Sequence, residues 1–351
     1  MNYNINEIIC IIREIGMAGK VNYIKIKERR MALGITQSEL SEQTNIAIST
    51  IKSLETGRAK MNLEKEDNMK RFIKLCQVLD FNIDEVYQED FRETKVIAIA
   101  NHKGGCGKSS ITSGLSYALV ELGYKVLMVD TDPQSHLTLN YKITVDSKEN
   151  LGTAIINGES LEKYIKPTEY ANLDIVPADI SMSSLEMSLF NRYGREFLIK
   201  NSLDELINKG IYDFIIFDTN PTLGMVNFNV LVASDYVIVP VKMTPNDVYG
   251  VNGIESFMRG VQQKQFNPKL KLLGYLINEY NIREIITRTT EEDFRADVSN
   301  DKIFKTIIRV DTNMKNSQRY QLPVNIYHPN SRISKELIEL AKEVVKKCRQ
   351  N

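Results

Sequence analysis

One short stretch constrains the fold of this chain more than any other, and it reads Lys103-Gly104-Gly105-Cys106-Gly107-Lys108-Ser109. It follows the apolar run KVIAIA, which is typical of a buried strand, and it opens a helix predicted over Ser109–Leu122. Glycines let backbone N–H groups curl around an anion, and the helix N-terminus adds the positive end of its dipole. Strand, loop and helix together predict a phosphate-binding loop.

The residue types in this loop assign its chemistry. Lys108 is expected to reach the β- and γ-phosphates of a nucleotide, and the Ser109 hydroxyl is expected to join the shell of a Mg²⁺ ion. The expected nucleotide contacts are Lys103, Gly104, Gly105, Cys106, Gly107, Lys108, Ser109 and Ser110. Cys106 could be a low-pKa thiol at a helix N-terminus, but we favour simple replacement by a small residue.

Beyond a charged stretch at Gln88–Lys95, apolar runs alternate with helical segments. The runs lie at Val96–Ala100, Val126–Val129, Leu173–Val176, Phe214–Phe217, Tyr236–Val241, Leu270–Ile277 and Thr306–Val310. Strands that are apolar throughout are covered on both faces, and the alternation predicts a mainly parallel sheet flanked by helices. The fold class is therefore α/β, preceded by a small all-α region.

Two of these strands end in carboxylates. The stretch VLMVDTDPQ places Asp130 and Asp132 after one strand, and YDFIIFDTNPTLG places Asp218 at the end of another. Ligands bind at the carboxyl ends of strands in open α/β sheets, and the Asp218 carboxylate is suited to holding a Mg²⁺-bound water. Aspartates that only form a turn after a strand are the alternative for Asp130 and Asp132.

Lys103, a second lysine just before the glycines, makes the loop resemble that of the deviant Walker A ATPases. From Lys95 to about Val345 the chain resembles the ParA/Soj partition branch, in particular in LVASDYVIVPV, LLGYLINEYNIR and NMKNSQRYQLPV. One departure is Asn220, because relatives usually have Asp-Thr-Pro-Pro where this chain reads Asp-Thr-Asn-Pro.

The resemblance implies roles for individual residues. Lys103 would contact the nucleotide of the opposing subunit in an ATP-bound dimer, and Asp132 would position or activate the attacking water. The implied catalytic residues are Lys103, Lys108 and Asp132, and the implied metal-site residues are Ser109, Asp130 and Asp218. Asn278, at the end of LLGYLIN, would contact adenine.

The resemblance also implies slow ATP hydrolysis stimulated by a ParB-like centromere-binding partner, and non-specific DNA binding by the ATP-bound homodimer. The candidate DNA contacts are Arg283, Arg288, Lys315, Arg319 and Arg332. Each could also be an ordinary solvated surface charge. Basic residues outnumber acidic ones in residues 306–351, which suits phosphate contact. Such a protein would be cytoplasmic and associated with the nucleoid.

Residues 34–58, GITQSELSEQTNIAISTIKSLETGR, resemble the Cro/phage-repressor helix-turn-helix family. Thr36 with Glu39 predicts a capping box, and Asn45 tolerates the left-handed backbone that the turn needs. Ala47 replaces the usual Ser/Thr cap of the second helix. The residues expected to contact DNA are Gln37, Ile48, Ser49, Lys52 and Ser53. A protein-interaction module on the same scaffold is the alternative.

These patterns predict a domain order. Residues 1–20 form an amphipathic helix with isoleucines on one stripe, either packed on its own domain or acting as a dimerisation arm. Residues 21–93 form the helix-turn-helix domain, in which we expect helices and no strand, and residues 94–351 form the ATPase domain.

Composition limits the alternatives. The 45 basic and 45 acidic residues balance, so any DNA contact must use a local basic patch. The 4 cysteines and 3 histidines lack zinc-ligand spacing and cannot supply the Fe–S cluster of the nitrogenase iron-protein branch, and no apolar stretch is long enough to span a membrane. Ser334–Gln350 is amphipathic, which predicts a last helix docked on the sheet or a MinD-like membrane anchor.

The sequence therefore predicts a DNA-partition ATPase that requires ATP and Mg²⁺, dimerises on ATP and represses its own operon through the helix-turn-helix. Two alternatives remain open. One is a transcription regulator whose nucleotide site only switches DNA affinity, and the other is a MinD-like positioning ATPase on membranes.

Overall fold

The computed structural model describes residues 19–21, 23–55, 66–81, 87–89, 94–263 and 265–350. The chain divides into two compact units, Met1–Arg92 and Glu93–Asn351. The helix predicted over residues 1–20 lies outside the described residues, apart from residues 19 and 20, which belong to a strand.

The N-terminal unit is built around short helices. They are α2 (Tyr23–Ala32), α3 (Gln37–Thr44), α4 (Ile48–Glu55) and α5 (Glu66–Val78). Strands β1 (Gly19–Val21) and β2 (Tyr87–Glu89) pair antiparallel, which corrects the expectation of a purely helical region. Because the ladder has three residues on each side, it rests on backbone hydrogen bonds and leaves no hydrophobic periodicity in the sequence.

The helix-turn-helix geometry follows from a few residues. The Thr36 side chain accepts from the N–H of Glu39, whose side chain accepts in return from the N–H of Thr36, so the predicted capping box is confirmed. Asn45 ends α3 with φ 55°, in the left-handed region expected for it. Leu40, Ile46 and Ile51 are buried with residues of α5 in one hydrophobic core.

The second unit contains a sheet whose order, within the described residues, is β5-β6-β4-β7-β3-β8-β9. The strands are β3 (Lys95–Ile99), β4 (Val126–Asp130), β5 (Lys166–Pro167), β6 (Leu173–Val176), β7 (Phe214–Asp218), β8 (Tyr236–Val241) and β9 (Lys271–Ile277). Within this sheet, all described pairs are parallel except β5 with β6. The predicted α/β class with a mainly parallel sheet is confirmed.

Two details of the sheet differ from prediction. Strand β5 was not expected, because two residues ending in a proline carry no strand pattern. The strand predicted over Thr306–Val310 does not form. Arg309 makes only an isolated parallel bridge with Tyr280, and the N–H groups of Lys305 and Thr306 donate to the Glu343 carboxylate instead of to a neighbouring strand.

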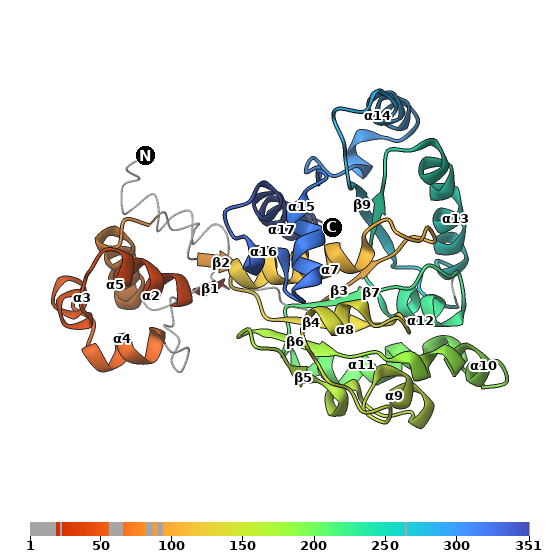
Figure 1. Ribbon diagram of the computed structural model, residues 1–351. Helices are drawn as coiled ribbons and strands as arrows, with labels where there is room; N and C mark the ends of the chain where they lie inside the picture. Colours follow the sequence, from red (N-terminus) through yellow and green to blue (C-terminus); the bar gives the residue numbers. More distant parts are fainter. Residues whose placement is uncertain are drawn as a thin grey trace. The chain divides into compact units, whose positions relative to one another are not determined.

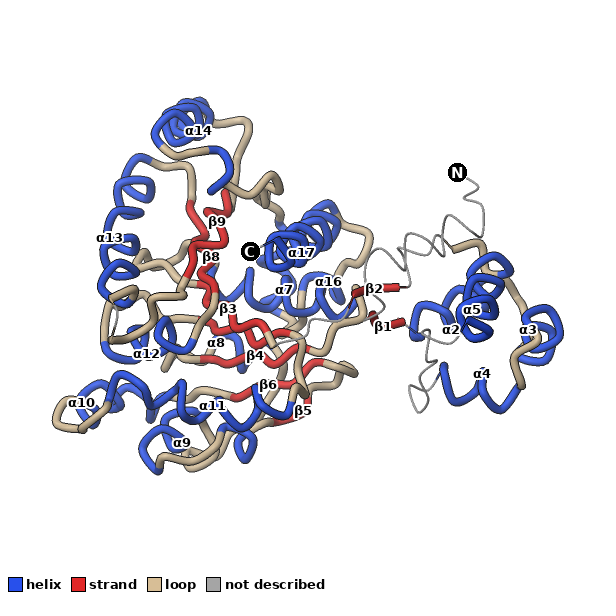
Figure 2. The backbone as a smooth tube through the Cα atoms, turned by 180° about the vertical axis from the view of Figure 1, so that it is seen from behind, coloured by secondary structure: helices blue, strands red, loops and turns tan. Residues whose placement is uncertain are grey.

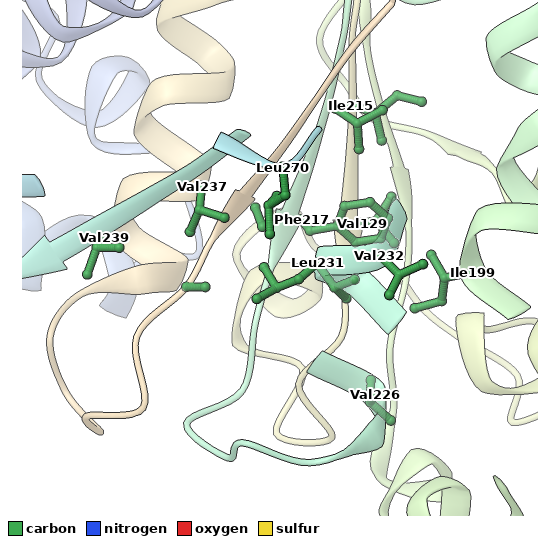
Figure 3. Packing of buried hydrophobic residues seen from close by; sticks show 14 of the residues in the cluster. Val129, Ile199, Ile215, Phe217, Val226, Leu231, Val232, Val237, Val239 and Leu270 are labelled. Atoms are coloured by element: carbon green, nitrogen blue, oxygen red, sulfur yellow. The ribbon is translucent and has the colours of Figure 1, made fainter. Parts of the chain in front are cut away.

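Helices cover both faces of this sheet (Figures 1 and 2). Helices α7 (Lys108–Glu121) and α17 (Arg332–Gln350) pack together on one face, and α11 (Leu198–Lys209), α12 (Met225–Ala233) and α13 (Pro245–Val261) contribute to the core on the other. Figure 3 shows this second core, where Val129 and Phe217 of the sheet lie near Leu231 and Val232 of α12.

Shorter elements complete the unit. The α-helices are α8 (His136–Asn140), α9 (Leu151–Asn157), α10 (Leu185–Leu189), α14 (Ile285–Asp297), α15 (Thr312–Arg319) and α16 (Val324–Tyr327). The 3-10 helices are η1 (Leu161–Tyr164), η2 (Ile180–Ser184), η3 (Arg195–Phe197) and η4 (Asn300–Lys302).

Helix α17 is docked through its apolar side. Leu337, Leu340, Ala341 and Val344 are all buried, and the methyl groups of Leu337 lie against Gly114 of α7. This confirms the predicted docked helix, because the apolar face that a membrane anchor would need is already covered. Among the helices of the described residues, none is both long enough and apolar enough to cross a lipid bilayer.

Candidate nucleotide-binding site

The phosphate loop connects the end of β3 to α7 at the carboxyl edge of the sheet. Gly105 and Gly107 have φ values of 72° and 87°, which favour glycine. A Cβ atom at Gly107 would also lie only 2.3 Å from Nδ2 of Asn278. Gly107 is therefore required by both backbone conformation and space.

Two buried asparagines hold the loop. Asn101 donates from Nδ2 to the carbonyl of Pro240 on β8 (2.8 Å) and accepts the N–H of Lys103 through Oδ1 (3.1 Å). Asn278 follows β9 and donates from Nδ2 to the carbonyl of Cys106 (2.8 Å). This position explains Asn278 without a base contact, and the adenine contact implied by the resemblance stays a prediction.

Lys108 is 7% exposed, and its Nζ donates to the carbonyl of Lys103 (3.1 Å) across the loop. Cys106 is buried directly beside it, with Sγ donating to the same carbonyl (3.3 Å). Burial raises the pKa of the Cys106 thiol, although the Lys108 charge acts in the opposite direction. This supports the interpretation of Cys106 as a small buried replacement and argues against a low-pKa nucleophile.

A cleft of about 520 Å³ opens over the loop. It is lined by Gly104, Gly105, Gly107, Lys108, Ser109, Ser110, Asp132, His136, Leu139, Asn140, Pro221, Glu279, Gln318 and Gln321. Six of the predicted loop residues and Asp132 therefore meet in one cleft. The predicted nucleotide-site residues that do not line it are Lys103, Cys106, Asp130, Asp218 and Asn278. A larger hollow of about 770 Å³ lies along α11, but none of the predicted site residues lines it.

Several lining residues were not predicted from the sequence. Gln318 comes from α15, and its Nε2 donates to Oγ of Ser110 (2.8 Å). Glu279 directly follows Asn278, has φ 50° and forms an ion pair with Lys242 (2.7 Å). In the sequence, only the strand that ends just before Asn278 indicated that this segment lies near the loop. No sequence motif indicated Gln318 or Gln321.

Asp218 ends β7 and is fully buried, and neither carboxylate oxygen makes a hydrogen bond within ordinary distance and angle limits. Burial raises its pKa well above the ordinary value, and the Asp130 charge adds to this. The nearby Ser109 hydroxyl and Lys108 ammonium act in the opposite direction. A buried carboxylate without a partner is costly, and it fits a cation such as Mg²⁺.

The small number of protein ligands near Asp218 suits a hard cation that is held partly by phosphates. Among the residues that the structure describes, no three His, Cys, Asp or Glu side chains gather as metal ligands. Mg²⁺ is commonly bound by one or two carboxylates together with substrate phosphates, so Asp218 with the Ser109 hydroxyl fits this ion.

Asp130 differs from Asp218 because its oxygens are already engaged. Oδ2 accepts from the N–H (3.0 Å) and hydroxyl (2.7 Å) of Thr138, and Oδ1 accepts from the N–H of Asp132 (3.1 Å). Burial raises the pKa of Asp130 to about 6 despite these bonds. They favour a role in orienting the loop that carries Asp132, and a direct metal contact stays a prediction.

Asp132 is partly exposed at the wall of the cleft, and its Oδ1 accepts the N–H of Gln134 (2.9 Å). The side chain is thus held at the end of β4 with its carboxylate on the cleft side of the loop. A carboxylate in this place can orient a water molecule or accept a proton from it.

The structure also explains Asn220, the departure from the usual proline. Its Oδ1 accepts from the N–H (2.9 Å) and hydroxyl (2.7 Å) of Thr222. Asn227 of α12 donates to the carbonyl and Oδ1 of Asn220 (both 2.9 Å). Side-chain hydrogen bonds thus shape the loop after Asp218, where relatives would use a second proline, and Pro221 still lines the cleft.

The candidate DNA contacts of this unit fall into two groups. Arg283, Arg288, Lys315 and Arg319 are exposed and form no ion pair with any described residue. Arg332 donates to the carbonyl of Val310 (2.8 Å) and lies within 3.8 Å of both Asp311 and Glu336 carboxylates. The first group is available to phosphates, whereas Arg332 is partly engaged.

In the helix-turn-helix, α4 exposes Ile48, Ser49 and Lys52, and Ser53 is partly exposed. Gln37 donates from Nε2 to Oε2 of Glu55 (2.8 Å). Glu55 is in turn held by Arg30 through two hydrogen bonds (2.6 and 3.0 Å). Hydrogen bonds of Glu55 thus join the end of α4 to α2 and α3. Contact with DNA stays a prediction for each of these residues.

Comparison with known proteins relates both units of the chain to known families. Residues 94–272 match the family model described as an AAA domain, and residues 26–66 match a helix-turn-helix model. An uncharacterised protein of Methanocaldococcus jannaschii is 33% identical over 256 residues, which cover 71% of this chain and 98% of that protein. The sporulation initiation inhibitor protein Soj of Bacillus subtilis is 32% identical over 253 residues, with coverage of 71% and 98%.

Among solved structures, the cobyrinic acid a,c-diamide synthase of Mycobacterium smegmatis, crystallised with an ATP analogue and magnesium, matches with a TM-score of 0.62. It is 28% identical, and the match covers 73% of this chain and 96% of that one. The phosphate loop with its extra lysine, the strand-end aspartates and these matches lead to one conclusion: the chain belongs to the ParA/Soj family of deviant Walker A ATPases and carries an N-terminal helix-turn-helix domain.

Proposed function

We propose that this protein is a DNA-segregation ATPase that dimerises on ATP, binds DNA and represses its own operon. The observation that carries the proposal is one cleft lined by Lys108 and Asp132, with the buried, unpartnered Asp218 close to Lys108, in a chain that also has a helix-turn-helix.

In the proposed reaction, the loop N–H groups and Lys108 hold the phosphates of ATP. Asp218 and the Ser109 hydroxyl would hold Mg²⁺, which neutralises charge on the phosphates when bound. Asp132 orients the attacking water and accepts its proton, and Asp130 supports Asp132 through the N–H of that residue. Lys103 reaches the nucleotide of the second subunit, so that dimerisation depends on the γ-phosphate.

The dimer would bind DNA without sequence preference through the exposed cations Arg283, Arg288, Lys315 and Arg319, and would thereby associate with the nucleoid. A ParB-like partner bound to a centromere would stimulate the slow hydrolysis and release the dimer. The helix-turn-helix would read an operator, because a palindromic site needs two copies of α4.

Two substitutions test the ATPase assignment. Lys108→Ala should abolish ATP binding, because it removes the buried ammonium that meets the phosphates. Asp132→Ala should retain ATP binding and dimerisation but slow hydrolysis by at least about 100-fold, since general-base contributions are of that order. Calorimetric titration, sedimentation with a non-hydrolysable analogue and phosphate release measure the three steps. Normal hydrolysis by Asp132→Ala contradicts the assignment of Asp132.

The helix-turn-helix favours a second candidate, a transcription regulator in which the nucleotide only switches DNA affinity. Turnover decides between the two. If hydrolysis stays at background with DNA and the product of a neighbouring ParB-like reading frame present, while ATP or ADP still changes operator affinity, the regulator is supported. The membrane-positioning alternative is disfavoured because α17 is docked, and flotation with liposomes and ATP tests it.

A further inference from the structure

His102 and Lys103 lie against one face of α13. A Cβ atom at Gly253 would lie 3.0 Å from Cε1 and 3.2 Å from Nδ1 of His102. A Cβ atom at Gly250 would lie 3.2 Å from Cε1 of His102 and 3.3 Å from both Cγ and Cε of Lys103. Residues three apart share one side of a helix, so Gly250 and Gly253 form one surface, the glycine face of α13.

The His102 ring is held there by packing. Its Nδ1 is buried without a hydrogen-bond partner. Burial lowers the pKa of His102, and the charges of Lys103 and Lys108 lower it further. An unpartnered buried nitrogen is unfavourable, and no hydrogen bond made by that atom explains the position of the ring. The close contact of the ring with the glycine face explains its position.

The backbone around Lys103 is fixed on both sides. Its N–H donates to Asn101, and its carbonyl accepts from Lys108 and from the thiol of Cys106. Only the side chain of Lys103 is left to move, and its methylene groups run over Gly250. An atom added at Gly250 would therefore have to displace the side chain of Lys103 rather than its backbone.

We propose that His102 and the glycine face of α13 are positioning residues for Lys103: they hold its side chain in the orientation from which it reaches the nucleotide of a second copy of the chain. This inference rests on the proposed ATP-dependent dimer and adds a physical connection from α13 to the subunit contact. A Cβ atom on the glycine face displaces the ring and the lysine together.

The test is Gly253→Ala in the full chain, with Gly260→Ala as the matched control. Gly260 lies on the same helix, and a Cβ atom there meets nothing within 4 Å. Both substitutions replace a glycine of α13 by alanine, and only Gly253→Ala adds an atom against His102. Sedimentation with a non-hydrolysable ATP analogue gives the dimer affinity. A fluorescent ATP analogue at low protein concentration gives the affinity of the monomer for nucleotide.

We expect Gly253→Ala to weaken dimerisation by about tenfold or more, since a small misplacement of a contact group has effects of that size. Nucleotide affinity should stay within about twofold, because Lys108 is not moved, and a general structural defect would reduce both quantities. Gly260→Ala should match the wild type. Equal dimerisation by the two glycine variants overturns the inference.

His102→Ala tests the same contact without adding an atom and is informative even if Gly253→Ala folds poorly. It should weaken dimerisation, and the double variant His102→Ala/Gly253→Ala should be no weaker than the worse single variant, because both act through one contact. Additive losses or unchanged dimerisation overturn the inference. A wild-type protein that stays monomeric with the analogue instead overturns the proposed function and this inference with it.

Discussion

Two buried carboxylates illustrate how single residues differ in this protein. Glu55 accepts hydrogen bonds from Arg30 and Gln37, and these bonds outweigh its burial and lower its pKa. Asp218 is buried more deeply, its carboxylate oxygens have no hydrogen-bond partner, and its pKa is raised. The Glu55 carboxylate finds all its partners within the chain and stabilises the helix-turn-helix. The Asp218 carboxylate has none there and is suited to binding a metal cation.

Arg30→Met should destabilise the N-terminal unit by about 3 kcal/mol at neutral pH, because it leaves the Glu55 charge buried and unpaired. Hydrogen exchange of the α4 amides measures the change. The pKa of Glu55 is lowered from its ordinary value of 4.5, so its contribution is present above that pH and is lost as the pH falls through the folded-state pKa. The penalty in the variant should therefore shrink in acid.

Arg29→Met is the control for this prediction. Arg29 pairs with Asp80 at 3.4 Å, but the two side chains are 40% and 89% exposed. Exposed pairs contribute little, so this variant should lose less than about 1 kcal/mol. If Arg30→Met is as stable as Arg29→Met, the buried Arg30–Glu55 pair is not needed for the stability of the N-terminal unit.

At the scale of elements, the apolar strand runs and the phosphate loop were predictable because each is a local pattern. Strand β7 ends at Asp218 as the run FIIFD indicates, and β6 has the predicted bounds. The failures have two physical causes. The β1–β2 ladder and the missing strand at Thr306–Val310 depend on partners far along the chain, such as the Glu343 carboxylate, whereas β5 pairs with the nearby β6 and is too short to leave a strand pattern.

Packing of α17 on α7 can be tested by a pair of substitutions. Leu337 is fully buried, and its methyl groups lie against Gly114. Leu337→Ala should cost about 3 kcal/mol of unfolding free energy by creating a cavity. Adding Gly114→Ala should recover part of this loss, because its Cβ atom fills space that Leu337 vacates. Denaturant unfolding measures both changes.

Lys346→Ala, on the exposed side of α17, is the reference and should change stability by less than about 0.5 kcal/mol. A double variant that is less stable than Leu337→Ala alone would show that Gly114 and Leu337 do not share one contact.

At the scale of the whole molecule, the site is assembled from segments that sequence patterns could only partly connect. Lys108, Asp132 and Asp218 were predictable because each follows a recognisable strand. His102, Glu279 and Gln318 were not, since their positions depend on α13, the end of β9 and α15 lying beside the loop. Which cations are free was also not predictable, because Arg332 and Arg319 are equivalent in sequence.

The difference between these arginines predicts the salt dependence of DNA binding. Arg319→Ala should reduce the slope of log affinity against log salt concentration by about 1, as expected for the loss of one phosphate contact. Arg332→Ala should reduce it less, because Arg332 already lies near Asp311 and Glu336. Binding of the ATP-bound protein to random-sequence DNA at several salt concentrations measures both slopes. Equal slopes for the two variants would contradict the division into free and engaged cations.

Strand β3 carries the phosphate loop, yet its neighbours in the sheet are β7 and β8, whose pairing begins at Phe214 and Tyr236. During synthesis on the ribosome, the loop therefore emerges well before the strands that flank it and before Asn278, which holds its backbone. In a nascent chain that ends before Asn278, the pocket cannot close. In one that ends before Phe214, the apolar strand β3 has no strand to pair with. Translation order therefore predicts that the loop reaches its final conformation only after Asn278 has left the ribosome.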